Sequence, residues 1–145
     1  MNDNAKIAIY PGSFNPFHIG HYNILQKAEA IFDHVIIARG GNPFKKNDER
    51  YPMPMETLAK RQIMEYDGML TDFIKELPFK NVTVIRGLRN ASDLSYEITQ
   101  YRYLQHFMPD IQVVSIFCAA EYEHISSSAI KALKVLGREG DFLLK

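Results

Sequence analysis

The sequence contains a single cysteine and carries no net charge. One thiol, Cys118, excludes an intrachain disulfide and fits a reducing compartment, and its apolar neighbours predict that it is buried. Seventeen basic side chains balance seventeen acidic ones, so no overall field draws the chain to nucleic acid or to an anionic membrane. We therefore expect no nucleic acid and no membrane among its partners, and an anionic ligand has to meet a local cluster of donors.

Signals for membrane spanning and for secretion are also missing. No apolar run approaches the roughly 18 residues that a membrane span needs. The start, Met-Asn-Asp-Asn, has neither the basic region nor the long apolar run of a signal peptide. Without these two signals, we predict a cytoplasmic location. Because no repeat, low-complexity tract or linker divides the chain, we predict one domain over residues 1–145.

Short apolar runs alternate with segments of helical periodicity along the chain. The apolar runs predict strands over residues 6–10, 35–38, 82–85 and 113–117. Helical spacing and capping residues predict helices over residues 24–32, 54–63, 69–77, 92–108 and 125–136. This order predicts a single α/β domain with a Rossmann-like, doubly wound parallel sheet, whose ligands bind beyond the carboxyl ends of the strands.

Residues 10–21 join the first predicted strand to the first predicted helix. The unpaired N–H groups at a helix start, with the positive end of the helix dipole, form an anion site. Gly12 lets a ligand approach the backbone, Ser13 adds a hydroxyl, and His18 and His21 follow. Two histidines without a third ligand do not predict a metal site. The plainer alternative is a capped helix with surface histidines, but the position directly after a strand favours a nucleotide.

A second polar cluster follows the predicted strand over residues 82–85. Arg86 and Arg89 are close together there, and guanidinium groups suit phosphate oxygens better than ammonium groups do. Asp93 and Glu97 lie on the next predicted helix and could pair with these arginines or bind a ribose hydroxyl, Asp93 being favoured as the structural partner. The plainer alternative is a pair of solvated loop arginines.

Two other polar stretches are less specific. Residues 39–54 are predicted to form a polar, proline-rich loop that contains Lys45 and Lys46, where an exposed pair of lysines is ordinary. Ser126, Ser127 and Ser128 open the last predicted helix. One serine is enough to cap a helix, so the remaining hydroxyls and amides are left for a second phosphate.

Together these motifs resemble those of bacterial phosphopantetheine adenylyltransferases. The resemblance rests on Tyr-Pro-Gly-Ser-Phe-Asn-Pro with HIGH at residues 18–21, on Arg-Gly-Leu-Arg at 86–89 with Asp93 and Tyr96-Glu97, and on Glu-Tyr with Ile-Ser-Ser-Ser at 125–128. HxGH and the terminal serines mark the wider nucleotidyltransferase superfamily, whereas Arg-Gly-Leu-Arg with the downstream Asp and Tyr-Glu indicates this member.

The resemblance implies a Mg²⁺-dependent transfer of AMP from ATP to 4'-phosphopantetheine in coenzyme A biosynthesis, by an enzyme that assembles as a homohexamer. The implied catalytic residues are His18, His21, Lys45 and Arg89. The residues implied for ATP are Ser13, Phe14, His21, Gly87, Leu88, Arg89, Glu97, Tyr122, Ser126, Ser127 and Ser128. Those implied for the acceptor are Ser13, Lys45, Leu70 and Arg86, and none is implied as a metal ligand.

The implied reaction needs no general base, because a phosphomonoester is already largely ionised near neutral pH. The enzyme mainly has to align this nucleophile with the α-phosphorus and neutralise charge. His21, either cationic or donating a hydrogen bond, would act where charge develops, and no covalent intermediate is required.

The chain also departs from the family pattern in two places. Residues 47–85 look shorter than usual, so one strand is expected to be reduced to residues 64–66. Ser13 and Asn15 give a loop also seen in relatives that adenylylate nicotinate or nicotinamide mononucleotide, so such an acceptor stays open.

Three further hypotheses stay open beside these two acceptors. They are a transferase that joins CTP to a small alcohol phosphate, a non-catalytic nucleotide-binding relative, and a fragment of a class I aminoacyl-tRNA synthetase. Against the non-catalytic relative stands the complete set of motif histidines and arginines. Against the synthetase fragment stand the absence of a KMSKS segment and the neutral charge.

Overall fold

The computed structural model describes residues 4–41 and 49–145. Its sheet has five strands in the order β3-β2-β1-β4-β5, and every neighbouring pair is parallel. The strands are β1 (Ile7–Gly12), β2 (His34–Gly40), β3 (Gln62–Tyr66), β4 (Thr83–Leu88) and β5 (Gln112–Phe117). The order reverses between β1 and β4, which opens a crevice at their carboxyl ends. The predicted α/β, doubly wound architecture is confirmed.

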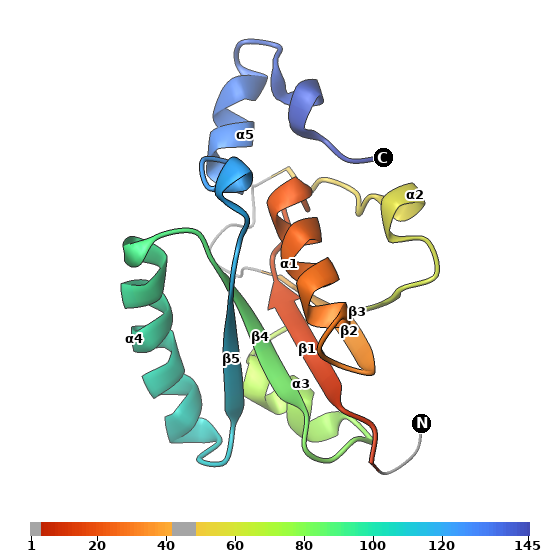
Figure 1. Ribbon diagram of the computed structural model, residues 1–145, viewed down its shortest axis with the longest axis vertical. Helices are drawn as coiled ribbons and strands as arrows, with labels where there is room; N and C mark the ends of the chain where they lie inside the picture. Colours follow the sequence, from red (N-terminus) through yellow and green to blue (C-terminus); the bar gives the residue numbers. More distant parts are fainter. Residues whose placement is uncertain (1–3, 42–48) are drawn as a thin grey trace.

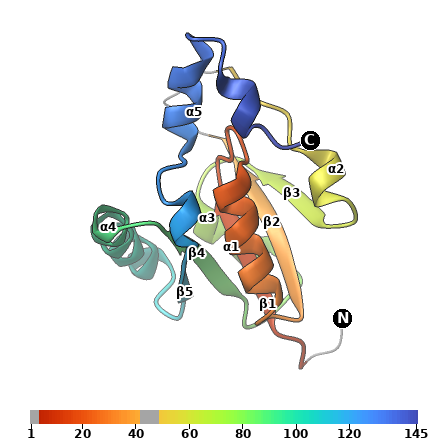
Figure 2. The ribbon, with the colours of Figure 1, turned by 45° about the horizontal axis from the view of Figure 1, so that its top comes forward.

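Helices cover both faces of the sheet and its carboxyl-terminal end. The helices are α1 (Ile19–Glu29), α2 (Met55–Leu58), α3 (Leu70–Glu76), α4 (Ala91–Phe107) and α5 (Ser127–Lys134), with short 3₁₀ helices η1 (Ala120–Tyr122) and η2 (Glu139–Phe142). Figures 1 and 2 show α1 in front of the sheet, α3 behind it, and α5 beyond the carboxyl ends of the strands. No helix within the described ranges is long and apolar enough to cross a membrane.

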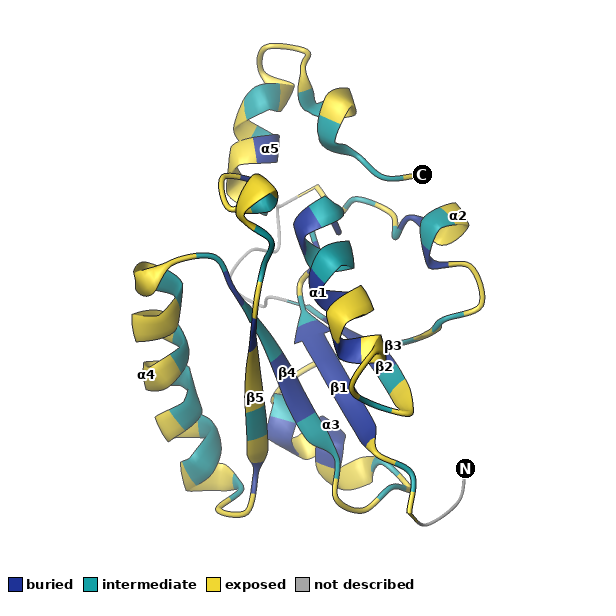
Figure 3. Ribbon diagram, in the orientation of Figure 1, coloured by how far each residue is buried: buried dark blue, intermediate teal, exposed yellow. Residues whose placement is uncertain are grey.

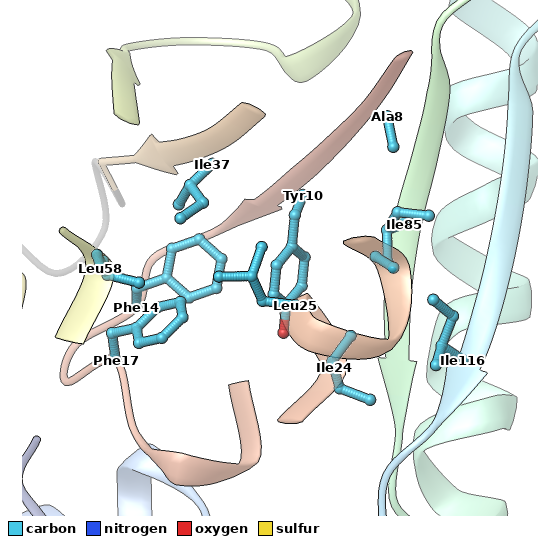
Figure 4. Close-up of a cluster of buried hydrophobic side chains, with 11 residues drawn as sticks. Ala8, Tyr10, Phe14, Phe17, Ile24, Leu25, Ile37, Leu58, Ile85 and Ile116 are labelled. Atoms are coloured by element: carbon cyan, nitrogen blue, oxygen red, sulfur yellow. The ribbon is translucent and has the colours of Figure 1, made fainter. Parts of the chain in front are cut away.

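The core forms two layers because side chains of a strand alternate between faces. Ala8 and Tyr10 of β1 pack with α1, while Ile7 and Ile9 pack with α3. Figure 3 shows β1 and β2 mostly buried, and Figure 4 shows Phe14 grouped with other apolar side chains at the end of β1. Each fully buried isoleucine or leucine in these layers contributes about 2 kcal/mol to stability.

The helix predicted over residues 54–63 is wrong beyond its first turn. The helix α2 ends at Leu58, where Ala59 adopts a left-handed φ of 44° that an α-helix cannot continue. Ile63 lies instead in β3, paired with Ile37 of β2. The strand expected to be reduced to residues 64–66 is thus a five-residue edge strand. Sheet pairing overrides the helical spacing that the local sequence suggests.

Three smaller expectations also change. The cap of α4 is Asn90, whose Oδ1 accepts from the N–H of Asp93 at 2.9 Å, so the helix begins before Ser92. The strand β2 continues through Arg39, which the sequence assigns to a loop. Cys118 is half-buried rather than buried.

Candidate active site

A cavity of about 450 Å³ opens at the carboxyl ends of β1 and β4. Its wall combines the loop after β1, the start of α1, the turn from β4 to α4, and the start of α5. The residues implied by the resemblance that line it are Ser13, Phe14, His18, His21, Arg86, Gly87, Leu88, Arg89, Glu97, Ser126, Ser127 and Ser128. The fold therefore brings together three motifs that are widely separated in the sequence.

Two of the implied site residues that the structure describes, Leu70 and Tyr122, are not part of this wall. Leu70 begins α3 and packs against the second core layer. Tyr122 lies in η1 and is not among the residues that line the cavity. Lys45 lies outside the described residues. Their implied contacts with substrate stay predictions.

The two histidines form a stacked pair at the start of α1. Their ring centroids are 3.7 Å apart with an interplanar angle of 24°. The N–H of Gly20 donates to Nδ1 of His18, and the N–H of His18 donates to Nδ1 of His21, both at 3.1 Å. Because each Nδ1 is an acceptor, a neutral ring carries its proton on Nε2. Each histidine thus has an Nε2–H donor.

The surroundings favour neutral imidazoles. Burial lowers the pKa of His18 to about 4, and the positive charge of Arg89 adds to this lowering. For His21, burial again has the largest effect on the pKa, followed by the neighbouring His18, and the pKa falls well below its ordinary value. Near neutral pH both rings are uncharged donors, so of the two forms considered for His21 the neutral hydrogen-bond donor is favoured.

The two cavity arginines are each held by a carboxylate. Arg86 donates from Nε and Nη2 to the two oxygens of Glu97 at 2.7 and 2.8 Å. Arg89 binds Asp93 in the same way at 2.9 and 3.0 Å, and its own N–H donates to the same carboxylate. These bonds lower the pKa of Asp93. Bidentate pairing orients each guanidinium, so the plainer alternative of solvated loop arginines is wrong.

The serines at the start of α5 have different partners. Ser126 is the N-cap, and its Oγ accepts from the N–H of Ala129 at 3.1 Å. Ser127 donates through Oγ to the carbonyl of Pro16 at 3.0 Å, which ties α5 to the loop after β1. Ser128 lies in the cavity wall. As expected, a single serine, Ser126, caps the helix. The hydroxyl of Ser127 instead binds a residue outside the helix, Pro16.

Two glycines in the wall are required by side-chain packing. A Cβ at Gly12 would lie 2.8 Å from a ring carbon of Phe14, and one at Gly87 would lie 2.9 Å from Cγ1 of Ile24. The sequence predicts that Gly12 lets a ligand approach, whereas the structure adds an aromatic ring packed on it. Phe14 itself has a φ of 46°, a left-handed conformation that is rare for an aromatic residue.

Several wall residues are not among the site residues that the resemblance implies. Tyr10 and Ile24 look like ordinary core residues of a strand and a helix, yet both reach the cavity. Tyr96 is on the cavity side of α4, and Cys118 follows the carboxyl end of β5. The position of Cys118 directly after a strand is a signal that could have placed it at this edge of the sheet.

The described residues contain no group of three or more histidine, cysteine, aspartate or glutamate side chains that could hold a metal ion. The two carboxylates in the cavity wall, Asp93 and Glu97, are engaged by arginines. This donor set suits Mg²⁺ that keeps its water ligands and is bound mainly through substrate phosphates.

The sequence matches known families over most of its length. Residues 9–133 match the family model described as Cytidylyltransferase-like. The phosphopantetheine adenylyltransferase of Clostridium botulinum is 37% identical over 139 residues, which cover 91% of this chain and 84% of that protein. The corresponding protein of Clostridium tetani is 34% identical over 139 residues, covering 91% of this chain and 86% of that one.

Solved structures share the fold at lower sequence identity. A putative nicotinate-nucleotide adenylyltransferase from Vibrio parahaemolyticus superposes with a TM-score of 0.65 at 16% identity, covering 97% of this chain and 88% of that one. A bifunctional NMN adenylyltransferase/ADP ribose pyrophosphatase from Francisella tularensis superposes with a TM-score of 0.57 at 13% identity, covering 97% of this chain and 43% of that one. At such identities the likeness shows the fold alone.

Proposed function

The chain belongs to the cytidylyltransferase-like family, among the phosphopantetheine adenylyltransferases, and we propose that it transfers AMP from ATP to 4'-phosphopantetheine, releasing pyrophosphate and dephospho-coenzyme A. The observation that carries this proposal is the convergence of HxGH, Arg-Gly-Leu-Arg and the terminal serines on one cavity. A relative 37% identical over 91% of the chain supports the choice of acceptor.

In the proposed reaction the acceptor phosphate attacks the α-phosphorus of ATP. The phosphate is already ionised, because its second pKa is about 6, so no residue has to remove a proton. His21 donates its Nε2–H to the α-phosphate as charge develops there, and His18 donates to the neighbouring phosphates. Neutral histidine donors stabilise this charge without themselves losing or gaining a proton.

The proposal gives the two arginines different substrates. Arg86, fixed by Glu97, binds the acceptor together with Ser13, Lys45 and Leu70, and its guanidinium holds the acceptor phosphate. Arg89, fixed by Asp93, holds the ATP phosphates. The paired carboxylates prevent the guanidinium groups from rotating, so alignment is built into the free enzyme and costs little when substrate binds.

The other proposed ATP contacts are backbone groups and hydroxyls of the cavity wall and of η1. They come from Phe14, Gly87, Leu88, Tyr122, Ser126, Ser127 and Ser128. Both carboxylate oxygens of Glu97 already accept from Arg86, but a carboxylate has about four acceptor sites. Glu97 therefore keeps capacity to accept a bond from a ribose hydroxyl.

We propose Mg²⁺ as the cofactor, bound through the phosphates of ATP rather than by a cluster of side chains. When bound, it neutralises phosphate charge and so assists the departure of pyrophosphate. The described donors that line the cavity are hydroxyls, backbone groups, histidines and arginines. These groups orient the phosphates and leave metal coordination to phosphate oxygens and water.

A self-associated enzyme, a hexamer by family resemblance, is part of the proposal. The 17-residue helix α4 has no buried residue, although it carries many apolar side chains. Exposed apolar residues of α4 and of the edge strand β5 are Leu94, Tyr96, Ile98, Tyr103, Phe107, Val114 and Phe117. In Figure 3 no part of α4 is coloured as buried. Apolar side chains this exposed support a contact with another copy of the chain.

The proposed function is tested by measuring pyrophosphate release from ATP and Mg²⁺ with different acceptors offered separately. We expect release with 4'-phosphopantetheine and none with nicotinate or nicotinamide mononucleotide. Release only with a mononucleotide would keep the mechanism and replace the acceptor. The absence of pyrophosphate release with all three acceptors, despite ATP binding, would contradict the proposed activity.

A further inference from the structure

Arg39 is a buried cation directly behind the loop that follows β1. This residue is 4% exposed and does not line the cavity. Nε donates to the carbonyl of Ser13 and Nη2 to that of Phe14, each at 3.2 Å. Nη2 also donates to the carbonyl of Tyr51 at 2.5 Å. Within the described ranges no carboxylate lies at ion-pair distance from Arg39.

These bonds fix the direction of two peptide groups. In a trans peptide the C=O and the following N–H point in opposite directions. The carbonyls of Ser13 and Phe14 point back at Arg39, so the N–H groups of Phe14 and Asn15 point away from it. Ser13 and Phe14 line the cavity and Arg39 does not, so the N–H of Phe14 is directed to the cavity side.

The backbone conformation agrees with this direction. Phe14 has a φ of 46°, and a left-handed residue within a turn makes successive N–H groups converge into a concave anion site. Such a conformation costs about 1 kcal/mol or more for a residue other than glycine. The hydrogen bonds from Arg39 to the carbonyls of Ser13 and Phe14 offset that cost.

We propose that Arg39 is a positioning residue that turns the backbone N–H groups of the loop after β1 toward the substrate phosphates. This proposal rests on the proposed function. The guanidinium holds both carbonyls away from the phosphates, where they would repel the anion. Its positive charge, not neutralised by a described carboxylate, adds a favourable field behind the loop.

The same side chain joins this loop to the segment beginning at residue 49. Arg39 binds the carbonyl of Tyr51, while Asn15 accepts from the N–H of Tyr51 at 2.7 Å and donates to the carbonyl of Glu49 at 2.9 Å. Only a planar group with several donors can reach all three carbonyls that Arg39 binds. A lysine keeps the charge but has one donor atom, so it cannot hold both peptide groups.

The experiment compares Arg39→Ala and Arg39→Lys with the control Arg61→Ala. Arg61 also makes three hydrogen bonds, to Glu29 and Thr57, but it lies away from the cavity wall. We measure melting temperature, kcat, KM for each substrate, and the affinity for inorganic pyrophosphate by calorimetry. For Arg39→Ala we also add guanidinium chloride at tens of millimolar, far below denaturing concentrations, to occupy the vacated position.

We expect Arg39→Ala to lower kcat/KM on the order of 100-fold through misplaced phosphate donors, and pyrophosphate affinity about tenfold. Guanidinium should restore part of both losses, and Arg39→Lys should be impaired without being restored. Arg61→Ala should change the melting temperature alone. If Arg39→Ala does not fold, Arg39→Lys supplies the same kinetic and binding comparison.

The proposal is overturned if the Arg39 variants lose melting temperature as Arg61→Ala does while kcat/KM and pyrophosphate affinity stay at wild-type values. A loss of turnover with unchanged pyrophosphate affinity would also overturn it. If the unmodified protein does not use phosphopantetheine, the proposed function fails, but the pyrophosphate affinities still decide the role of Arg39.

Discussion

At the scale of single residues, the site depends on where each histidine keeps its proton. The Nδ1 atoms of His18 and His21 both accept from backbone N–H groups. Burial also lowers the pKa of each ring. The hydrogen bonds and the burial thus both indicate that each ring is neutral and carries its proton on Nε2. This protonation state can be tested at each ring.

Replacing His21 with Asn should lower turnover by a factor on the order of 100 to 1,000 because a transition-state donor is lost. The amide oxygen of Asn can take the place of Nδ1 and still accept from the N–H of His18, so the fold is kept. His21→Gln is the matched control, since its amide can donate near the Nε2 position. Steady-state kinetics in which Asn and Gln are equally active would contradict the role given to Nε2–H.

The lowered pKa of His18 predicts a pH-dependent stability. The folded state, with a pKa of about 4, binds fewer protons than the unfolded state, whose histidine pKa is about 6.5. The contribution is therefore fully present above pH 6.5 and is lost as the pH falls toward 4. We expect the melting temperature to decrease over this interval, with a smaller slope in His18→Asn. Equal slopes for the two proteins would show that His18 does not cause the effect.

At the scale of elements, the turn from β4 to α4 supplies both arginines and both acids. Arg86 and Arg89 lie at the end of the strand, and Glu97 and Asp93 project from the first turns of the helix. The pair of Arg86 and Glu97 links β4 to α4, whereas the pair of Arg89 and Asp93 links the turn before α4 to the helix. Both pairs lie in the cavity wall. One element boundary therefore carries the arginines proposed for both substrates.

Arg86→Ala should raise KM for the acceptor more than KM for ATP, because Arg86 is assigned to the acceptor phosphate. It should also cost about 3 kcal/mol of unfolding free energy, since Glu97 is left as a largely buried charge without its partner. Substrate kinetics and denaturant titration measure the two effects separately.

The double variant Arg86→Ala/Glu97→Gln provides the control for this prediction. Removing the orphaned charge should restore part of the stability but not the KM for the acceptor. A selective rise in KM for ATP in the single variant would reverse the assignments of Arg86 and Arg89.

At the scale of the whole molecule, α4 and the edge strand β5 form a side on which apolar side chains are exposed. Ile98 of α4 is 49% exposed and Phe117 of β5 is 75% exposed. The edge strand β5 also leaves backbone groups of one side unpaired within the sheet. Another copy of the chain bound to this side would bury both the exposed apolar side chains and the unpaired backbone groups of β5.

Ile98→Glu should therefore lower the molar mass in solution, measured by light scattering, because a carboxylate cannot be buried in an apolar contact without a large cost. Val135→Glu is the control, since Val135 is 87% exposed but lies at the end of α5, away from this side. Unchanged mass in Ile98→Glu, or an equal loss in both variants, would contradict a contact through α4.

The sequence by itself determined the order of elements and the motifs that end the strands. Apolar runs and helical spacing depend on neighbouring residues, so they predicted four of the five strands and the convergence of the histidine, arginine and serine motifs. The parallel arrangement follows because alternating strands and helices place every carboxyl end at one edge of the sheet. The family resemblance comes from the same local motifs.

Tertiary structure alone decided which partners these residues have. Arg39 binds carbonyls of Ser13 and Phe14, 26 and 25 residues away, although the sequence assigns it to a polar loop. The strand β3 forms through pairing with β2, and Leu70 packs against the core layer that contains Phe73 and Ile74. Such choices depend on contacts between distant segments, whose energies no local pattern records, so only the packed sheet fixed them.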